Sequence, residues 1–350
     1  MKNTIIYITA IFVSLSLISC EKLILGEDEV NEPINNFELL WNDFNEHYAL
    51  FEVRGLDWNS MYETYRPMIT STTTDGELWS IFTNMLAYLD DSHTYIYNRK
   101  DEIAYVSGSE DDETIIAEFS KDLLRDKYIE NVESFEEYPL EFYFDGKVKD
   151  KNIGYMYLGG IGFNKKEVDE VLNNIAAFPA LIIDLRHNQG GDDYIAADLA
   201  NRFADEVKLS HTVEEKNGPG PNDFGEQIMY KTKPSDRVRY DKPIVILTDA
   251  FTVSAAEVFL LYTKQITDIT QIGTYTSGDF SDISMERFLP NGWSYQFSIM
   301  KFLTPEGISL DGLGHEPNVF INNEASDIEN DNDLVLEAAI DFIFDTYGIE

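Results

Sequence analysis

The stretch LTDAFTVSAAE, residues 247–257, marks the change from a buried strand to a helix. Residues 243–249 form a nearly continuous apolar run, which indicates a strand buried on both faces. A helix of about a dozen residues is expected to start near Val253. Ser254 therefore lies at the turn, close to free backbone N–H groups and the positive end of a helix dipole. This position suits a nucleophile and the oxyanion that it generates, but an ordinary N-cap serine has the same local sequence.

Strands and helices alternate around this stretch. Strands are expected at 153–158, 180–185, 243–248 and 269–273, and helices at 165–178, 194–204 and after Ser254. This alternation is typical of βαβ units around a sheet that is covered on both faces. A hairpin is expected at 287–303, and an amphipathic helix at 333–347 closes the chain. We assign residues 151–350 to this α/β core.

The chain before the core divides into three parts. Residues 20–35 are acidic, contain Pro33 and lack periodicity, which is typical of a tether. Apolar residues at helical spacing, together with a Thr74–Glu77 capping box, predict an N-terminal helical bundle over residues 36–98. Residues 99–150 form a poorly readable connecting region, too short for a typical inserted peptide-binding domain with its linkers.

The N-terminus indicates export and lipid attachment. Residues 1–19 carry Lys2 and an apolar run too short for a stable membrane span, so we interpret them as a signal peptide. The single cysteine, Cys20, ends the segment LISC, which resembles the lipobox of bacterial lipoproteins. The resemblance implies cleavage before Cys20 and lipid on its thiol. The protein would then lie in the cell envelope, at the outer membrane, facing the periplasm or the surface. A plain cleaved signal peptide is the alternative.

The charge balance narrows the classes of partner. With 64 acidic against 26 basic residues, the formal charge is −38, which argues against nucleic acid and against electrostatic attraction to anionic lipid. We expect neither a cofactor nor a metal. The sequence does not predict an oligomeric state.

Three further segments supply candidate partners for Ser254. DLRHNQGG, residues 184–191, follows a buried strand, and its glycines allow backbone N–H groups to face developing negative charge. DDSH, residues 90–93, places His93 in a polar context that suits a general base. LDGLGHEPN, residues 310–318, is rich in turns, and Asp311 there would orient the His93 imidazole. Each segment alone also has a purely structural interpretation, such as an aspartate that bonds its own backbone.

In this order along the chain, the four segments resemble the motifs of the serine peptidase family that contains the C-terminal processing (tail-specific) peptidases and the tricorn core peptidase. The resemblance covers roughly residues 36–344. It implies an α/β, ClpP/crotonase-like fold, although the family's PDZ module is not recognisable here. It also implies an acyl-enzyme on Ser254. The oxyanion hole would consist of a backbone N–H of the Gly190–Gly191 turn and that of Ala255.

The family has two catalytic variants. In the tail-specific branch the base is a lysine 25 residues after the serine, and that position is Asp279 here. In the tricorn-like branch the base is the histidine of an early Ser-His pair, which matches Ser92 and His93. A glutamate of the late motif, matched here by Asp311, completes that branch's relay with the serine. The resemblance therefore implies a serine endopeptidase-like hydrolase of the tricorn type, with a peptide or protein substrate.

Two alternatives stay open. A catalytically silent envelope lipoprotein would keep the fold and bind peptides, as the missing lysine and the shorter Asp311 side chain suggest. A different lysine, Lys264 or Lys301, would serve as the base, although neither stands at the family's position. Beside the glycine turn, three side chains are candidates for setting substrate preference: His187, Asp192 and Asp193.

Overall fold

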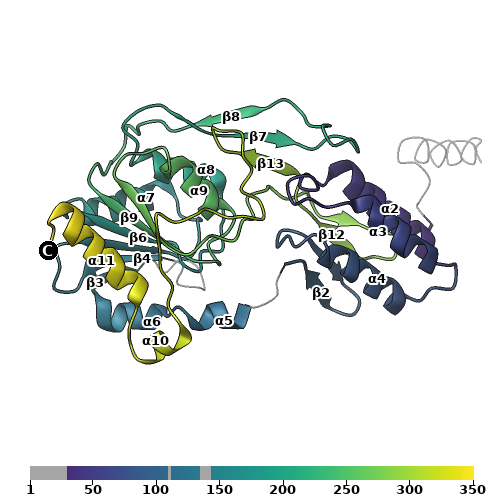
Figure 1. Ribbon diagram of the computed structural model, residues 1–350, viewed down its shortest axis with the longest axis horizontal. Coiled ribbons are helices and arrows are strands. Elements are labelled where there is room, and N and C mark those ends of the chain that lie inside the picture. The colour runs from purple at the N-terminus through teal and green to yellow at the C-terminus, as the bar shows by residue number, and fades with distance from the viewer. Residues whose placement is uncertain (1–29, 109–111, 135–142) are drawn as a thin grey trace, which may run out of the picture.

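A seven-stranded sheet forms the centre of the larger of two lobes (Figure 1). In the computed structural model, which describes residues 30–108, 112–134 and 143–350, the strand order is β14-β10-β9-β6-β5-β4-β3. The strands are β3 (Ile129–Ser134), β4 (Tyr143–Val148), β5 (Gly154–Leu158), β6 (Leu181–Asp184), β9 (Ile244–Thr248), β10 (Ile269–Gly273) and β14 (Val319–Phe320). Strands β5, β6, β9, β10 and β14 pair in parallel, and β4 and β3 add two antiparallel pairings at one edge. β5, β6 and β9 are buried along their whole length, in keeping with their apolar sequences.

Helices cover both faces of this sheet. On one face lie α7 (Lys165–Ile175), α8 (Asp193–Asn201) and α9 (Ala255–Thr263), which share a core with Ile183 and Ile246. On the other face, α11 (Leu334–Tyr347) packs against Val245 and Leu247. Successive side chains of each strand point to opposite faces of the sheet and therefore belong to the two cores in alternation. The short elements near α11 are α5 (Asp112–Ala117), α6 (Lys121–Leu123), the π-helix η2 (Leu124–Tyr128) and α10 (Ala325–Glu329).

The smaller lobe packs helices on an antiparallel sheet. Its helices are α2 (Pro33–His47), α3 (Trp58–Tyr65), the 3-10 turn η1 (Arg66–Met68) and α4 (Asp75–Ala87). Its sheet has the order β11-β12-β1-β2, with β1 (Tyr95–Asn98), β2 (Ile103–Val106), β11 (Arg287–Phe288) and β12 (Ser294–Gln296). Trp293 and Phe297 lie in the same core as Phe44 and Phe82. Residues 287–297, assigned above to the α/β core, therefore pack in the N-terminal lobe.

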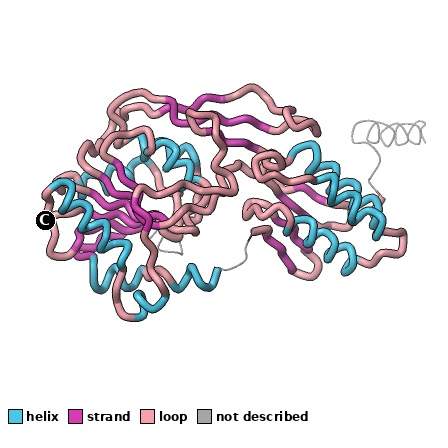
Figure 2. The backbone as a smooth tube through the Cα atoms, viewed as in Figure 1, coloured by secondary structure: helices cyan, strands magenta, loops and turns pink. Residues whose placement is uncertain are grey.

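A third sheet, of order β13-β7-β8, runs along the top of the larger lobe (Figures 1 and 2). Its strands are β7 (Leu209–Glu215), β8 (Ile228–Lys231) and β13 (Met300–Leu303). The hairpin expected at 287–303 forms in part, because β11 pairs antiparallel with β12 across the turn as predicted, whereas β13 pairs with β7. The further partners, β1 of β12 and β7 of β13, come from distant parts of the chain and were not expected from local sequence.

Some predicted elements begin or end at other residues than expected, and other predicted features lie outside the described residues. Helix α9 begins at Ala255, two residues after the expected start near Val253, because Ser254 has a positive φ that a right-handed helix excludes. The predicted signal peptide, Cys20 and most of the tether lie outside the described residues. No helix in the described part of the chain has the length and hydropathy needed to cross a membrane. Between β2 and β4, the described elements form no separate domain that would correspond to a PDZ module.

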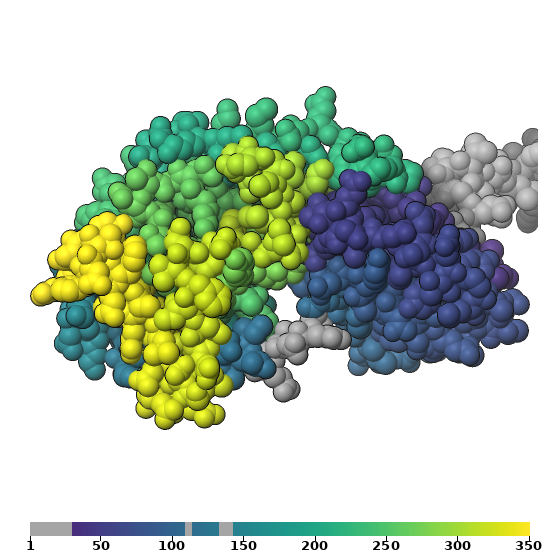
Figure 3. Space-filling model, in the orientation of Figure 1, coloured from purple at the N-terminus to yellow at the C-terminus, as the bar shows by residue number. Residues whose placement is uncertain are grey.

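The two lobes touch over part of their facing surfaces, and an opening is visible between them elsewhere (Figure 3). Arg54 and Ser92 of the N-terminal lobe donate hydrogen bonds to Asp279 of the larger lobe. Candidate residues from the two ends of the chain therefore meet at this contact.

Candidate active site

Ser254 occupies a sharp turn between β9 and α9. Its backbone has φ 60° and ψ −125°, a conformation that is unfavourable for a residue with a Cβ atom. Ser254 is the N-cap of α9, and the N–H of Ala255 makes no hydrogen bond within the described residues. The strained turn thus presents a hydroxyl beside an unpaired donor at the positive end of a helix.

A buried carboxylate, that of Glu257, ties this turn to a neighbouring loop. Its Oε2 accepts hydrogen bonds from the backbone N–H of Ser254 (3.2 Å) and of Asp279 (2.9 Å). Its Oε1 accepts from Thr276 Oγ1 (2.6 Å) and from the N–H of Gly278 (2.7 Å). Burial raises the pKa of Glu257 to about 8. Sequence reasoning treated Glu257 only as the end of the serine motif and missed this role, which the serine-x-x-glutamate spacing of a capping box could have signalled.

The glycine turn lies directly against the serine. A Cβ atom placed on Gly190 would lie 2.6 Å from Ser254 Cβ and 3.1 Å from its Oγ, so only glycine fits this position. The Gly190 N–H donates to Asn188 Oδ1 at 2.9 Å and is therefore already used. The N–H of Gly191, by contrast, makes no hydrogen bond within the described residues. Of the three predicted oxyanion-hole residues, Gly191 and Ala255 therefore have the available donors.

The segment that carries His93 reaches the serine turn through Asp279. Ser92 Oγ donates to Asp279 Oδ2 at 2.5 Å, and the backbone oxygen of Asp279 accepts from the N–H of Ser254 at 3.1 Å. The His93 N–H donates to the buried carboxylate of Asp91 at 3.1 Å. His93 Nδ1 is buried and has no hydrogen-bond partner among the described residues. Asp279 thus links Ser92, and with it the neighbouring His93, to the Ser254 turn, but no hydrogen bond joins the His93 ring to Ser254 among the described residues.

Asp311 lies near this region but makes different contacts from those expected. Its Oδ1 accepts from the N–H of Phe280 and its Oδ2 from Ser309 Oγ, both at 3.1 Å. It makes no hydrogen bond to Ser92 or His93. Burial raises the pKa of Asp311 to about 7. The carboxylate that the sequence offered as orienting group therefore holds the 278–280 loop.

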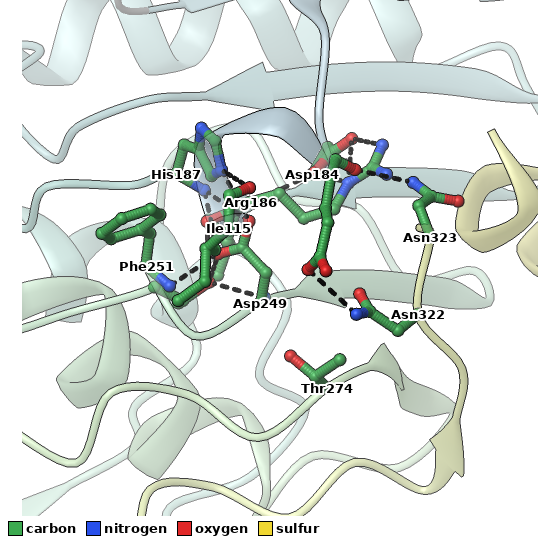
Figure 4. A network of polar contacts seen from close by, with 12 residues as sticks. Ile115, Asp184, Arg186, His187, Asp249, Phe251, Thr274, Asn322 and Asn323 are labelled. Atoms are coloured by element: carbon green, nitrogen blue, oxygen red, sulfur yellow. Dashed lines mark hydrogen bonds and ion pairs between the residues drawn. The ribbon is translucent and has the colours of Figure 1, made fainter. Parts of the chain in front are cut away.

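His187 belongs to a separate network at the ends of β6 and β9 (Figure 4). Its Nε2 lies 3.3 Å from the Ile115 oxygen, and its N–H donates to the Asp249 carboxylate at 3.0 Å. Burial lowers the pKa of His187 to about 4 and raises that of Asp249 to about 7. In the same network Arg186 pairs with Asp184 at 2.6 Å. These contacts give His187 a role in fixing the loop, and they provide no direct support for a substrate contact.

The other candidates near the glycine turn and the two alternative lysines also have defined positions. Asp192 caps α8 by accepting from the N–H of Tyr194 at 2.8 Å, and burial raises the pKa of Asp193 to about 7. Lys264 ends α9, roughly 15 Å along the helix from Ser254, and donates to the Glu316 oxygen at 2.9 Å. Lys301 pairs with Glu214 at 2.8 Å. Neither lysine makes a hydrogen bond to Ser254 among the described residues.

Family models match both lobes. Residues 152–321 match the model of peptidase family S41, and residues 30–87 match that of the tricorn protease C1 domain. The carboxy-terminal processing protease CtpA of Bacillus subtilis is 27% identical over 176 residues, which cover 49% of this chain and 36% of that protein. The chain thus spans about a third of the length of that curated relative.

Solved structures share the fold over most of the chain. A protein of Parabacteroides merdae, described as a candidate peptidase, is 27% identical with a TM-score of 0.79, covering 90% of this chain and 97% of that one. The tricorn protease has a TM-score of 0.55 at 17% identity, covering 90% of this chain and 36% of its own. The second similarity concerns the fold alone, and together the structures confirm the expected fold class.

Proposed function

We propose that this chain, whose α/β core belongs to peptidase family S41, is a serine peptidase that cleaves peptide bonds through an acyl-enzyme on Ser254. The observation that carries the proposal is the packing of Gly190 against Ser254 on a strained turn, beside N–H groups of Gly191 and Ala255 that make no hydrogen bond within the described residues. The Ser92–Asp279 contact adds His93 to the same region. The substrate class is a peptide or a protein, as befits a hydrolase of this kind.

The chemistry follows from these groups. His93 takes the proton of Ser254 Oγ, and the oxygen attacks the carbonyl carbon of the substrate. The N–H groups of Gly191 and Ala255 stabilise the oxyanion, each by roughly 3 kcal/mol. The imidazolium of His93 then protonates the leaving amine, the C–N bond breaks, and an ester remains on Ser254. Water attacks that ester with His93 again as base, which releases the acid product and restores the serine.

Labelling with a fluorophosphonate probe tests the proposal whatever the natural substrate is. The probe is expected to modify the purified protein at one site, and peptide mapping by mass spectrometry should place the adduct on Ser254. An unmodified protein, or an adduct on another residue, would contradict the proposal. A catalytically silent binding protein of the same fold would give that negative result, and the comparisons offer that alternative no support.

Gly190→Ala tests the contact between the glycine turn and the nucleophile. The new methyl group would displace the Ser254 side chain, so the labelling rate is expected to fall about 100-fold, as a misplacement of about 1 Å does. The matched control is Gly162→Ala, because a Cβ at Gly162 would meet no atom within 4 Å. Equal labelling rates for the two variants, both folded, would show that the contact is unimportant for reactivity.

We also propose that the mature protein is a lipoprotein of the cell envelope, anchored through Cys20. The support is the LISC segment after an apolar run, with the single cysteine of the chain at its end. Intact-mass analysis of protein purified from membranes should give a chain that begins at Cys20 with a diacylglyceryl group. A mature chain cut elsewhere, or an unmodified Cys20, would refute the anchor.

A further inference from the structure

We infer that Asp279 is the carboxylate that positions His93, acting through Ser92, in the role that was expected of Asp311. This inference rests on the proposed function. Asp279 stands where the tail-specific branch has its lysine base. In this chain the position would therefore hold a carboxylate that supports another base, His93. The side chain lies where three segments meet, and each segment contributes a contact.

The contacts of Asp279 connect both lobes. Its Oδ2 accepts from Ser92 Oγ at 2.5 Å and from Ser277 Oγ at 3.0 Å. Its Oδ1 accepts from Arg54 Nη2 at 2.5 Å. Arg54 also donates to the backbone oxygens of Asp90 and Gly278 and so ties the His93 segment to the loop. Because the Asp279 backbone oxygen accepts from Ser254, one residue connects the nucleophile's turn with the segment of the base.

This arrangement provides what a catalytic histidine needs. When His93 takes a proton on the nitrogen that faces the serine, the other nitrogen carries a proton that needs an acceptor. His93 Nδ1 is buried without a partner in the described structure. Ser92 donates its hydroxyl proton to Asp279, so toward His93 its Oγ can act only as a hydrogen-bond acceptor. The negative charge of Asp279 makes this oxygen a stronger acceptor. The proposed relay would run from Ser254 through His93 and Ser92 to Asp279. Of its links only Ser92–Asp279 is a hydrogen bond in the described structure, and the two links to the His93 ring would form when substrate binds.

The burial of the Asp279–Arg54 pair favours a functional role. Both side chains are only 7% exposed, and a buried ion pair contributes little stability compared with apolar residues of similar size. Asp311, by comparison, directs its oxygens to Phe280 and Ser309. Other charged groups that face the region are Asp91 and Asp282, and the charge of His93 interacts with that of Asp282.

Rates of fluorophosphonate labelling compare the carboxylates directly. Asp279→Asn keeps the shape and removes the charge, and it is expected to slow labelling of Ser254 about 100-fold. Two variants are the controls. Asp43→Asn removes the carboxylate of another ion pair with arginine, that with Arg287, and should stay within about threefold of the unmodified protein, whereas Asp311→Asn, which weakens the hold on Phe280, should lose less than Asp279→Asn. Adding Ser92→Ala to Asp279→Asn should cost little further, because both changes break the same relay. A larger loss in either control than in Asp279→Asn would overturn the inference, as would additive effects of the pair.

A second readout does not depend on peptidase activity. If Asp279 supports the charged imidazole, the titration midpoint of the His93 ring in nitrogen NMR should fall in Asp279→Asn and stay constant in Asp311→Asn. An unchanged midpoint in Asp279→Asn would refute the relay even if labelling slowed. If the unmodified protein failed to react with the probe but the midpoint fell as expected, only the proposed function would fail. If Asp279→Asn does not fold because Arg54 is left unpaired, Arg54→Met/Asp279→Asn serves for the same measurements.

Discussion

Replacement of Ser254 by alanine is expected to lower peptide hydrolysis by about 10⁶-fold, since the acyl-enzyme cannot form without the hydroxyl. The residual rate would come from substrate binding and from the N–H groups of Gly191 and Ala255, which the substitution leaves in place. Cleavage of a diverse peptide pool, followed by mass spectrometry, measures the loss whatever the cleavage specificity is. Ser309→Ala is the matched control because Ser309 bonds Asp311 and not the nucleophile's turn.

The backbone of Ser254 adds a test that separates function from stability. At φ 60° and ψ −125° a glycine is less strained than alanine or serine. Ser254→Gly is therefore expected to be more stable to unfolding than Ser254→Ala, by about 1 kcal/mol, and equally inactive. Thermal unfolding of the two variants checks this. If Ser254→Ala kept more than a hundredth of the hydrolysis rate, the nucleophile would lie elsewhere.

The α/β core could be predicted from sequence because its strands are buried on both faces. The apolar runs 180–185 and 243–248 predict parallel strands at the centre of the sheet. In the structure these runs form β6 and β9. Glycines and the serine at the ends of these strands had to meet at one edge of the sheet. The contact between Gly190 and Ser254 was predictable for this reason.

The contacts between the lobes could not be predicted in the same way. Ser92 and Asp279 are 187 positions apart, and no local periodicity encodes which loop carboxylate reaches a given hydroxyl. The resemblance pointed to Asp311 by its place in a motif, whereas hydrogen bonding selects Asp279. The same limit explains the hairpin at 287–296. Its alternation identifies strands but does not say that β1 is the partner of β12.

Replacement of His93 by alanine is expected to lower hydrolysis by about 10⁴- to 10⁶-fold, because Ser254 then has no base. The pH profile of the unmodified protein should rise near neutrality, as for a histidine base. Added imidazole should restore part of the His93→Ala activity, which would not happen if His93 only supported the fold. His47→Ala, from α2 of the same lobe, is the matched control, since its ring is 36% exposed and distant from the serine motif in sequence.

The result for His93 also decides whether a histidine or a lysine is the base that activates Ser254. With Asp279 in place of the tail-specific lysine, Lys264 at the far end of α9 and Lys301 paired with Glu214, neither candidate lysine contacts Ser254 in the described part of the chain. A profile that rises only well above neutrality, together with His93→Ala activity within tenfold of the unmodified protein, would require such a lysine and would contradict the assignment. Loss of activity with rescue by imidazole would instead place the base in the N-terminal lobe and the nucleophile in the core. The contact of Arg54 and Ser92 with Asp279 would then be a requirement for catalysis, because it holds those two lobes together at the site.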